Sequence, residues 1–132
     1  MRLRPGILTV VSLAALAGGA VAQDAGERRL SMPELSLCEP PQGPVQRPDW
    51  CTWPQEVRLY TQRRDECDHW RGEPVPDGID PALAADRRKQ IEQAVAELCA
   101  GADAQLLKLK RKYRSDASVM QALGGYEADI EP

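Results

Sequence analysis

Residues 52–72 read TWPQEVRLYTQRRDECDHWRG and carry the clearest helical pattern in the chain. Thr52 and Gln55 match a capping box, in which each side chain bonds a backbone N–H at the start of a helix. Pro54 falls in the first turn, where its missing N–H costs nothing, and Gly72 is a natural stop. The segment therefore predicts a helix with one broad apolar side, formed at helical spacing by Trp53, Val57, Leu59, Tyr60, Cys67 and Trp70.

A second helix is expected after a short connection, residues 73–79. Asp80 is a good N-cap, Pro81 suits the first helical position, and Gly101 ends the segment. At 1.5 Å per residue, the first two helices would each be roughly 28–30 Å long. A connection this short predicts that they are antiparallel neighbours. The buried stripe expected of the second helix comprises Leu83, Ala84, Ile91, Ala94, Val95, Leu98 and Cys99.

Two shorter helices complete the predicted domain. Asp103 is expected to cap the third, and Ser115 or Asp116 starts the fourth, which Gly124-Gly125 stops. No segment alternates at period two, so no strand is expected. The apolar sides comprise Leu106, Leu109 and Tyr113 in the third helix, and Val119, Met120 and Leu123 in the fourth. The prediction is an all-α fold, a small disulfide-braced bundle of about four helices in residues 52–127.

The first 22 residues form a typical export signal. Arg2 and Arg4 precede an apolar run at positions 7–17, and the small residues Ala20 and Ala22 suit a cleavage site. A membrane-spanning helix needs about 20 apolar residues, so this run is too short to be an anchor. We therefore expect cleavage after Ala22, a periplasmic or secreted protein, and no transmembrane segment in the remainder.

The expected mature chain has 110 residues, with 15 basic and 20 acidic side chains and a net charge of −5. This length allows one small domain and excludes a multidomain enzyme. The acidic balance argues against a general nucleic-acid binder. Residues 23–51 contain five prolines and are expected to form an extended, partly disordered arm. Residues 128–132 are expected to form a short tail.

The expected mature chain contains four cysteines, an even set that predicts two disulfides in an oxidising compartment. The paired Cys-x-x-Cys spacing of structural zinc sites is missing, so no metal is expected. In a simple hairpin of the first two helices, Cys99 lies beside Cys51, and Cys67 lies at the far end. We therefore favour Cys51–Cys99 with Cys38–Cys67. The main alternative, Cys67–Cys99 with Cys38–Cys51, would require crossed rather than antiparallel helices.

Chemically active side chains are densest near the end of the first predicted helix. Asp65 and His69 are four residues apart, so a helix would bring carboxylate and imidazole together as an oriented general base. Both project away from the apolar side, however, and no nucleophile is evident because the cysteines are expected to be oxidised. We therefore predict no enzymatic activity, no catalytic residue and no cofactor.

Two surfaces are candidates for binding a partner, although a solvated helix face is the simpler interpretation of each. The first follows from the enrichment of Trp and Arg at protein interfaces, and comprises Asp68, His69, Trp70, Arg71 and Glu73. The second would suit an acidic partner, an anionic lipid or an anionic glycan, and comprises Lys108, Lys110, Arg111, Lys112 and Arg114. Trp70 itself is expected in the core, because the protein has few other large apolar residues.

Three segments, taken together, resemble a group of small exported proteobacterial proteins: Cys67-Asp-His-Trp-Arg-Gly-Glu73, Leu98-Cys-Ala-Gly-Ala-Asp103 and Leu107-Lys-Leu-Lys-Arg-Lys-Tyr113. The match covers roughly residues 56–127. This resemblance implies a helical periplasmic domain, with no catalytic residues to carry over. In size, compartment and fold class the chain is also similar to disulfide-bonded immunity proteins that neutralise periplasmic toxins, and to helical lysozyme inhibitors.

The expected function is therefore non-catalytic binding to another protein of the cell envelope, as an inhibitor or immunity-type module. The alternative is a structural or stress protein of the envelope that adheres to peptidoglycan or to an anionic membrane surface.

Overall fold

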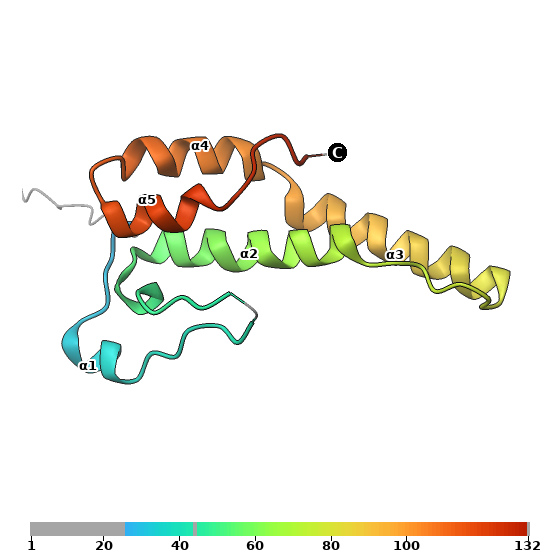
Figure 1. Cartoon of the computed structure of the whole chain (residues 1–132), viewed down its shortest axis with the longest axis horizontal. Helices are drawn as coiled ribbons and strands as arrows, with labels where there is room; N and C mark the ends of the chain where they lie inside the picture. Colours follow the sequence, from blue (N-terminus) through green and yellow to red (C-terminus); the bar gives the residue numbers. More distant parts are fainter. Residues whose placement is uncertain (1–25, 44, 132) are drawn as a thin grey trace, which may run out of the picture.

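The computed structural model describes residues 26–43 and 45–131 of the 132-residue chain (Figure 1). The predicted export signal lies outside these residues. Four helices form the body: α2 (Gln55–Gly72), α3 (Pro81–Cys99), α4 (Ala102–Lys112) and α5 (Ala117–Gly124). The arm holds a short helix, α1 (Met32–Ser36), and a 3₁₀ turn (Trp50–Thr52). No strand occurs in the described part of the chain, and the predicted all-α fold is confirmed.

Most helix ends lie where the local sequence signals predict them. The carboxylate of Asp80 accepts a 2.8 Å hydrogen bond from the backbone N–H of Ala82 at the start of α3. Asp116 caps α5 in the same way, through a 3.1 Å bond from the N–H of Val119. The helix α2 ends at Gly72. These signals act within a few residues, so they need no tertiary partner.

The start of α2 differs from the prediction. Thr52 lies in the 3₁₀ turn, and the predicted capping box with Gln55 is not formed. The helix begins at Gln55 instead, whose N–H donates a 3.0 Å hydrogen bond to the carbonyl of Arg28. The N–H of Glu56 similarly bonds the carbonyl of Gly26 at 3.3 Å. The arm therefore satisfies the free N–H groups of the helix start that a local side chain was predicted to bond.

The helix α3 is displaced along the axis of α2. Residues 73–80 run out beside α3 to its far end, and α3 then returns toward α2 (Figure 1). Pro74 and Pro76 favour extended backbone in the first part of this connection. Residues 77–79 then form a turn, with Gly78 at a φ of 73°, that leads into α3. The two helices are antiparallel but staggered, and the end of α3 meets the second half of α2.

This stagger decides the disulfide pairing. Cys67 is bonded to Cys99, with Cα atoms 5.2 Å apart, and Cys38 is bonded to Cys51, with Cα atoms 6.0 Å apart. The favoured pairing of Cys51 with Cys99 and of Cys38 with Cys67 is therefore wrong, and the alternative pairing is formed. The prediction assumed that α2 and α3 overlap along their whole length. In the loop-entropy model the two bridges stabilise the fold by about 3 and about 4 kcal/mol.

The main hydrophobic core lies where α2 packs against α4 and α5. It comprises Trp50, Trp53, Val57, Tyr60, Leu106, Leu109, Tyr113, Val119 and Leu123. The predicted buried stripe of α3 is formed only in part, because most of α3 extends beyond the body (Figure 1). Five of its residues are half-buried, namely Ala84, Ile91, Ala94, Val95 and Leu98. Of that stripe only Cys99 is fully buried, whereas Leu83 is 61% exposed. Leu59 on α2 is also exposed, contrary to the prediction.

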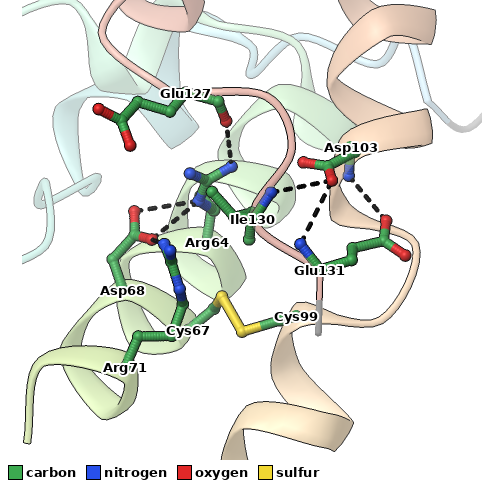
Figure 2. The surroundings of a disulfide bond; sticks show 9 residues. All are labelled: Arg64, Cys67, Asp68, Arg71, Cys99, Asp103, Glu127, Ile130 and Glu131. Atoms are coloured by element: carbon green, nitrogen blue, oxygen red, sulfur yellow. Dashed lines mark hydrogen bonds and ion pairs between the residues drawn. A yellow bond between two sulfur atoms is a disulfide. The ribbon is translucent and has the colours of Figure 1, made fainter.

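The C-terminal residues return to the body and cover the second disulfide (Figure 2). The carboxylate of Asp103, predicted to cap α4, accepts hydrogen bonds from the backbone N–H groups of Ile130 (3.0 Å) and Glu131 (3.3 Å) instead. The side chain of Ile130 is 5% exposed and packs against the buried Cys67–Cys99 bond. The last residues therefore belong to a second, smaller core.

Candidate functional site

A groove of about 940 Å³ lies between the arm, α2 and α5. The arm supplies one wall, with residues 41–43 and 45–49. Trp53 and the second half of α2 supply another, and residues 118–126 of α5 and the turn after it supply the third. This volume is at the upper end of the range typical of ligand pockets. The groove is therefore large enough to be a candidate binding site.

A hydrogen-bonded ion pair fastens the arm across this groove. The guanidinium of Arg47 donates to both carboxylate oxygens of Asp65 on α2, through Nη1 and, at 2.8 Å, through Nη2. The same Nη2 donates to the hydroxyl of Tyr126 at 2.8 Å, and that hydroxyl donates to Asp65 at 2.8 Å. Burial and the bond to Asp65 raise the pKa of Tyr126 far above its usual 10.0. The hydroxyl thus keeps its proton and remains a donor to Asp65.

A disulfide and two hydrogen bonds also hold the arm wall and the floor of the groove in place. The Cys38–Cys51 disulfide closes the loop of the arm that forms the wall. The Trp53 ring is 5% exposed, and its indole N–H donates a 3.0 Å hydrogen bond to the hydroxyl of Ser118 on α5. That hydroxyl donates in turn to Asp49 of the arm at 3.3 Å. The groove is therefore braced by a disulfide within the arm, and by ionic and hydrogen-bonded links between the walls.

The lining of the groove is acidic above an apolar floor. It carries one guanidinium, from Arg47, against four carboxylates, from Asp49, Asp65, Glu66 and Asp68. The formal charge of the lining residues is therefore −3 when the imidazole of His69 is neutral. Glu66 is exposed, and its carboxylate has no ion-pair partner among residues 26–43 and 45–131. This combination suits a ligand that carries both positive charge and apolar groups.

The predicted surface at the end of α2 is divided, and Asp68 and Arg71 belong to a structural cluster (Figure 2). Asp68 accepts hydrogen bonds from Arg64 Nε at 3.0 Å and from Arg71 Nη1 at 3.0 Å. The Arg64 side chain is only 2% exposed, and its Nη1 donates to the carbonyl of Glu127 at 2.9 Å. A shallow hollow of about 430 Å³ lies beside this cluster. Asp68 therefore holds the Arg64 side chain that anchors the C-terminal residues, and it also lines the groove.

The remaining predicted residues of α2 point in different directions. His69 is 65% exposed at the rim of the groove, and its Nε2 lies 3.3 Å from a carboxylate oxygen of Glu73. The general-base pair of His69 with Asp65 is not formed, because the Asp65 carboxylate is bonded to the arm. Trp70 is half-buried, with the guanidinium of Arg87 5.1 Å from its ring centre, and Arg87 also pairs with Glu73 at 2.8 Å. Trp70 and Glu73 therefore hold α3 to α2.

The five cations of the basic segment, residues 108–114, do not form one surface, because one of them faces the body of the protein. Lys112 lies 2.9 Å from the carboxylate of Glu56 and 5.5 Å from the ring centre of Tyr113. Its charge is therefore balanced within the body. Lys108, Arg111 and Arg114 are exposed, and Lys110 is half-buried. No acidic side chain among the described residues pairs with these four.

Comparisons with protein-family models, with curated proteins and with solved structures find no match to this chain. Within residues 26–43 and 45–131, no three His, Cys, Asp or Glu side chains are grouped so as to hold a metal ion. None of the helices in the same residues is long and apolar enough to cross a membrane. Because Cys67 is bonded to Cys99, its sulfur is also not free to act as a thiolate ligand.

Sequence reasoning missed the groove because its parts are far apart in the chain. Arg47 and Tyr126, which bond directly, are separated by 79 residues. Neither residue belongs to a recognisable motif, and Trp53 reads simply as a core residue. The prolines around Arg47, between two cysteines, were the only available signal, since they indicate a stiff loop with fixed ends.

Proposed function

We propose that this protein is an exported, non-catalytic binding protein that holds a positively charged polypeptide segment of a partner in the groove between the arm, α2 and α5. The observation that carries the proposal is the groove itself, with its acidic rim and apolar floor. Two disulfides are typical of a chain that folds in an oxidising compartment, which supports export. An inhibitor or an immunity-type module of the cell envelope fits this description.

The bracing of the groove favours binding. A segment that binds to a preformed site loses less free energy to ordering than one that binds to flexible loops. Here the Cys38–Cys51 bond and the contact of Arg47 with Asp65 and Tyr126 hold the arm in position before any ligand arrives. The groove is therefore organised in advance for a partner.

The charge of the groove favours a cationic partner over an acidic one. Asp49 on the arm and Glu66 on α2 are both exposed, and neither carboxylate is neutralised by a cation among the described residues. A lysine or arginine of the partner placed beside either residue would face an unneutralised carboxylate. The ring of Trp53, whose indole N–H bonds the same Ser118 hydroxyl as Asp49, offers an apolar contact near Asp49 for the side chains of the partner.

A library of random decapeptides displayed on phage tests the proposal directly. The oxidised protein is panned against the library, and the affinity of enriched peptides is measured by fluorescence anisotropy. We expect enriched peptides to be rich in Lys and Arg. The double variant Asp49→Lys with Glu66→Lys should bind them at least about tenfold more weakly, because like charges then face each other.

The matched control carries the same charge change outside the groove. Glu92 and Glu97 are exposed on α3, so Glu92→Lys with Glu97→Lys should leave the affinity within about twofold. Absence of any enriched peptide would refute the proposal. Equal weakening by both double variants would show that overall charge, and not the groove, governs binding.

A further inference from the structure

The outer side of α4 combines positive charge with an exposed apolar side chain. We call it the cationic face, and it comprises Leu107, Lys108, Arg111 and Arg114. Leu106 and Leu109 on the opposite side of the helix are buried in the core. The four residues of the cationic face are all exposed: Leu107 and Lys108 lie four and three residues before Arg111 on the far side of α4, and Arg114 lies in the turn that follows the helix.

The charges of the cationic face are not paired within residues 26–43 and 45–131. None of its three cations forms an ion pair with an acidic side chain in the described part of the chain. Their neighbour Lys112 provides the contrast, because it is turned inward and bonded to Glu56. The folding of the body therefore separates one structural cation from a set that is available to an external anion.

The exposed side chain of Leu107 indicates which kind of anionic surface fits the cationic face. It is 51% exposed, although the body has an apolar core to which α4 contributes Leu106 and Leu109. A carbohydrate or peptidoglycan surface has no apolar layer that an exposed leucine among cations could enter. A lipid bilayer accepts both groups, because cations bind anionic headgroups while an apolar side chain enters the acyl boundary.

We propose that the cationic face of α4 binds the surface of an anionic lipid bilayer. The part of the arm that lines the groove and α4 lie on opposite sides of α2 (Figure 1), so attachment through α4 keeps this part of the arm away from the lipid. The groove is partly formed by that arm. A protein attached in this way would present its arm to partners in solution, and the two surfaces would act independently.

Co-sedimentation with lipid vesicles tests this inference, using the oxidised protein as the expression host secretes it. One set of vesicles is phosphatidylcholine alone, and the other contains phosphatidylglycerol as well. We expect binding only to the phosphatidylglycerol vesicles, and a steep decline with added salt because exposed charges are screened. Equal binding to both sets of vesicles, or to neither, would overturn the inference.

Matched variants connect binding to the cationic face. Arg111→Gln with Arg114→Gln should weaken binding about 25-fold, since each cation near such a surface contributes about fivefold. The control, Arg88→Gln with Lys89→Gln, removes the same charge from exposed positions of α3 and should change binding by less than about twofold. Equal effects of the two double variants would mean that net charge alone is responsible.

Leu107→Ser separates a bilayer from other anionic surfaces, because it keeps every charge. We expect vesicle binding about fivefold weaker, with an unchanged circular dichroism spectrum. Isolated peptidoglycan serves as the competing surface in the same assay. Unchanged vesicle binding by this variant, or sedimentation with peptidoglycan in place of vesicles, would refute the bilayer as the occupant.

Discussion

Arg47 and Asp65 join the proline-rich arm to α2 through two parallel hydrogen bonds between guanidinium and carboxylate, one of them 2.8 Å long. The Arg47 side chain is 13% exposed, and its bond to Asp65 raises the pKa of the guanidinium further above its ordinary value. Together with the Cys38–Cys51 bond, this contact shapes a groove from a segment that has little regular structure of its own.

Replacing Arg47 by alanine should therefore destabilise the protein. The change leaves Asp65 and the Tyr126 hydroxyl without their common donor, which should lower the free energy of unfolding by about 2 kcal/mol. Arg28→Ala is the control, since Arg28 pairs with Glu34 at an exposed position and its loss should cost less than about 0.5 kcal/mol. Urea denaturation of both variants measures the difference, and equal midpoints would contradict the prediction.

The two disulfides should be reduced in a fixed order. Cys67 and Cys99 are completely buried, whereas Cys38 and Cys51 are only partly buried. Thiolate attack on a disulfide requires access to sulfur, so dithiothreitol should open Cys38–Cys51 first, without loss of the helical circular dichroism signal. Alkylation followed by peptide mass mapping identifies the opened bond. Initial modification of Cys67 or Cys99 in the folded protein would contradict this order.

The C-terminal residues should protect the inner disulfide. Ile130→Ala removes the side chain that covers Cys67–Cys99, so it should both accelerate reduction of that bond and destabilise the fold by about 2 kcal/mol. Leu59→Ala is the matched control, because Leu59 is 57% exposed and its truncation should cost less than about 0.5 kcal/mol. Identical reduction rates in the two variants would show that the C-terminal residues do not shield the bond.

The three tyrosines of the chain should resist ionisation while the protein is folded. Burial is the main cause that raises the pKa of Tyr60, Tyr113 and Tyr126 above 10.0, aided at Tyr113 by the carboxylate of Glu56. A raised pKa in the folded state favours the neutral form. The resulting stability is present below pH about 10, where the unfolded tyrosine titrates, and is lost as the pH rises further.

Ultraviolet titration measures this behaviour directly. Tyrosinate absorbance of the folded protein should rise only well above pH 10 and should coincide with the loss of helical circular dichroism. In urea the absorbance midpoint should lie near 10. A folded-state midpoint near 10 with an unchanged circular dichroism spectrum would contradict the prediction.

The helix ends of the body could be predicted because their signals are local. Asp80 and Asp116 cap helices with their own side chains, and Gly72 ends α2. The capping box predicted at Thr52 is not formed, because residues far away in the sequence decide where α2 begins. Carbonyls of the arm, from Arg28 and Gly26, bond the N–H groups at the start of α2, and no local pattern reports such distant acceptors.

The candidate sites, like the helix ends, could be predicted only where local sequence decides them. The segment 108–114 was recognisable as basic, but only packing shows that Lys112 faces Glu56 while Arg111 and Arg114 face outward. The groove could not be predicted at all, because Arg47 and Tyr126 become neighbours only when α5 packs beside α2.

By itself the sequence determined the fold class and most helix boundaries of this protein, because caps, prolines and glycines act within a few residues. Only the tertiary structure decided which cysteines pair. The pairing depends on the extended connection, residues 73–80, which shifts α3 along α2 and brings Cys99 to Cys67. The first residues of this connection and the turn at residues 77–79 carry the chain away from the end of α2 before α3 begins, so the end of α3, and not its start, lies beside Cys67.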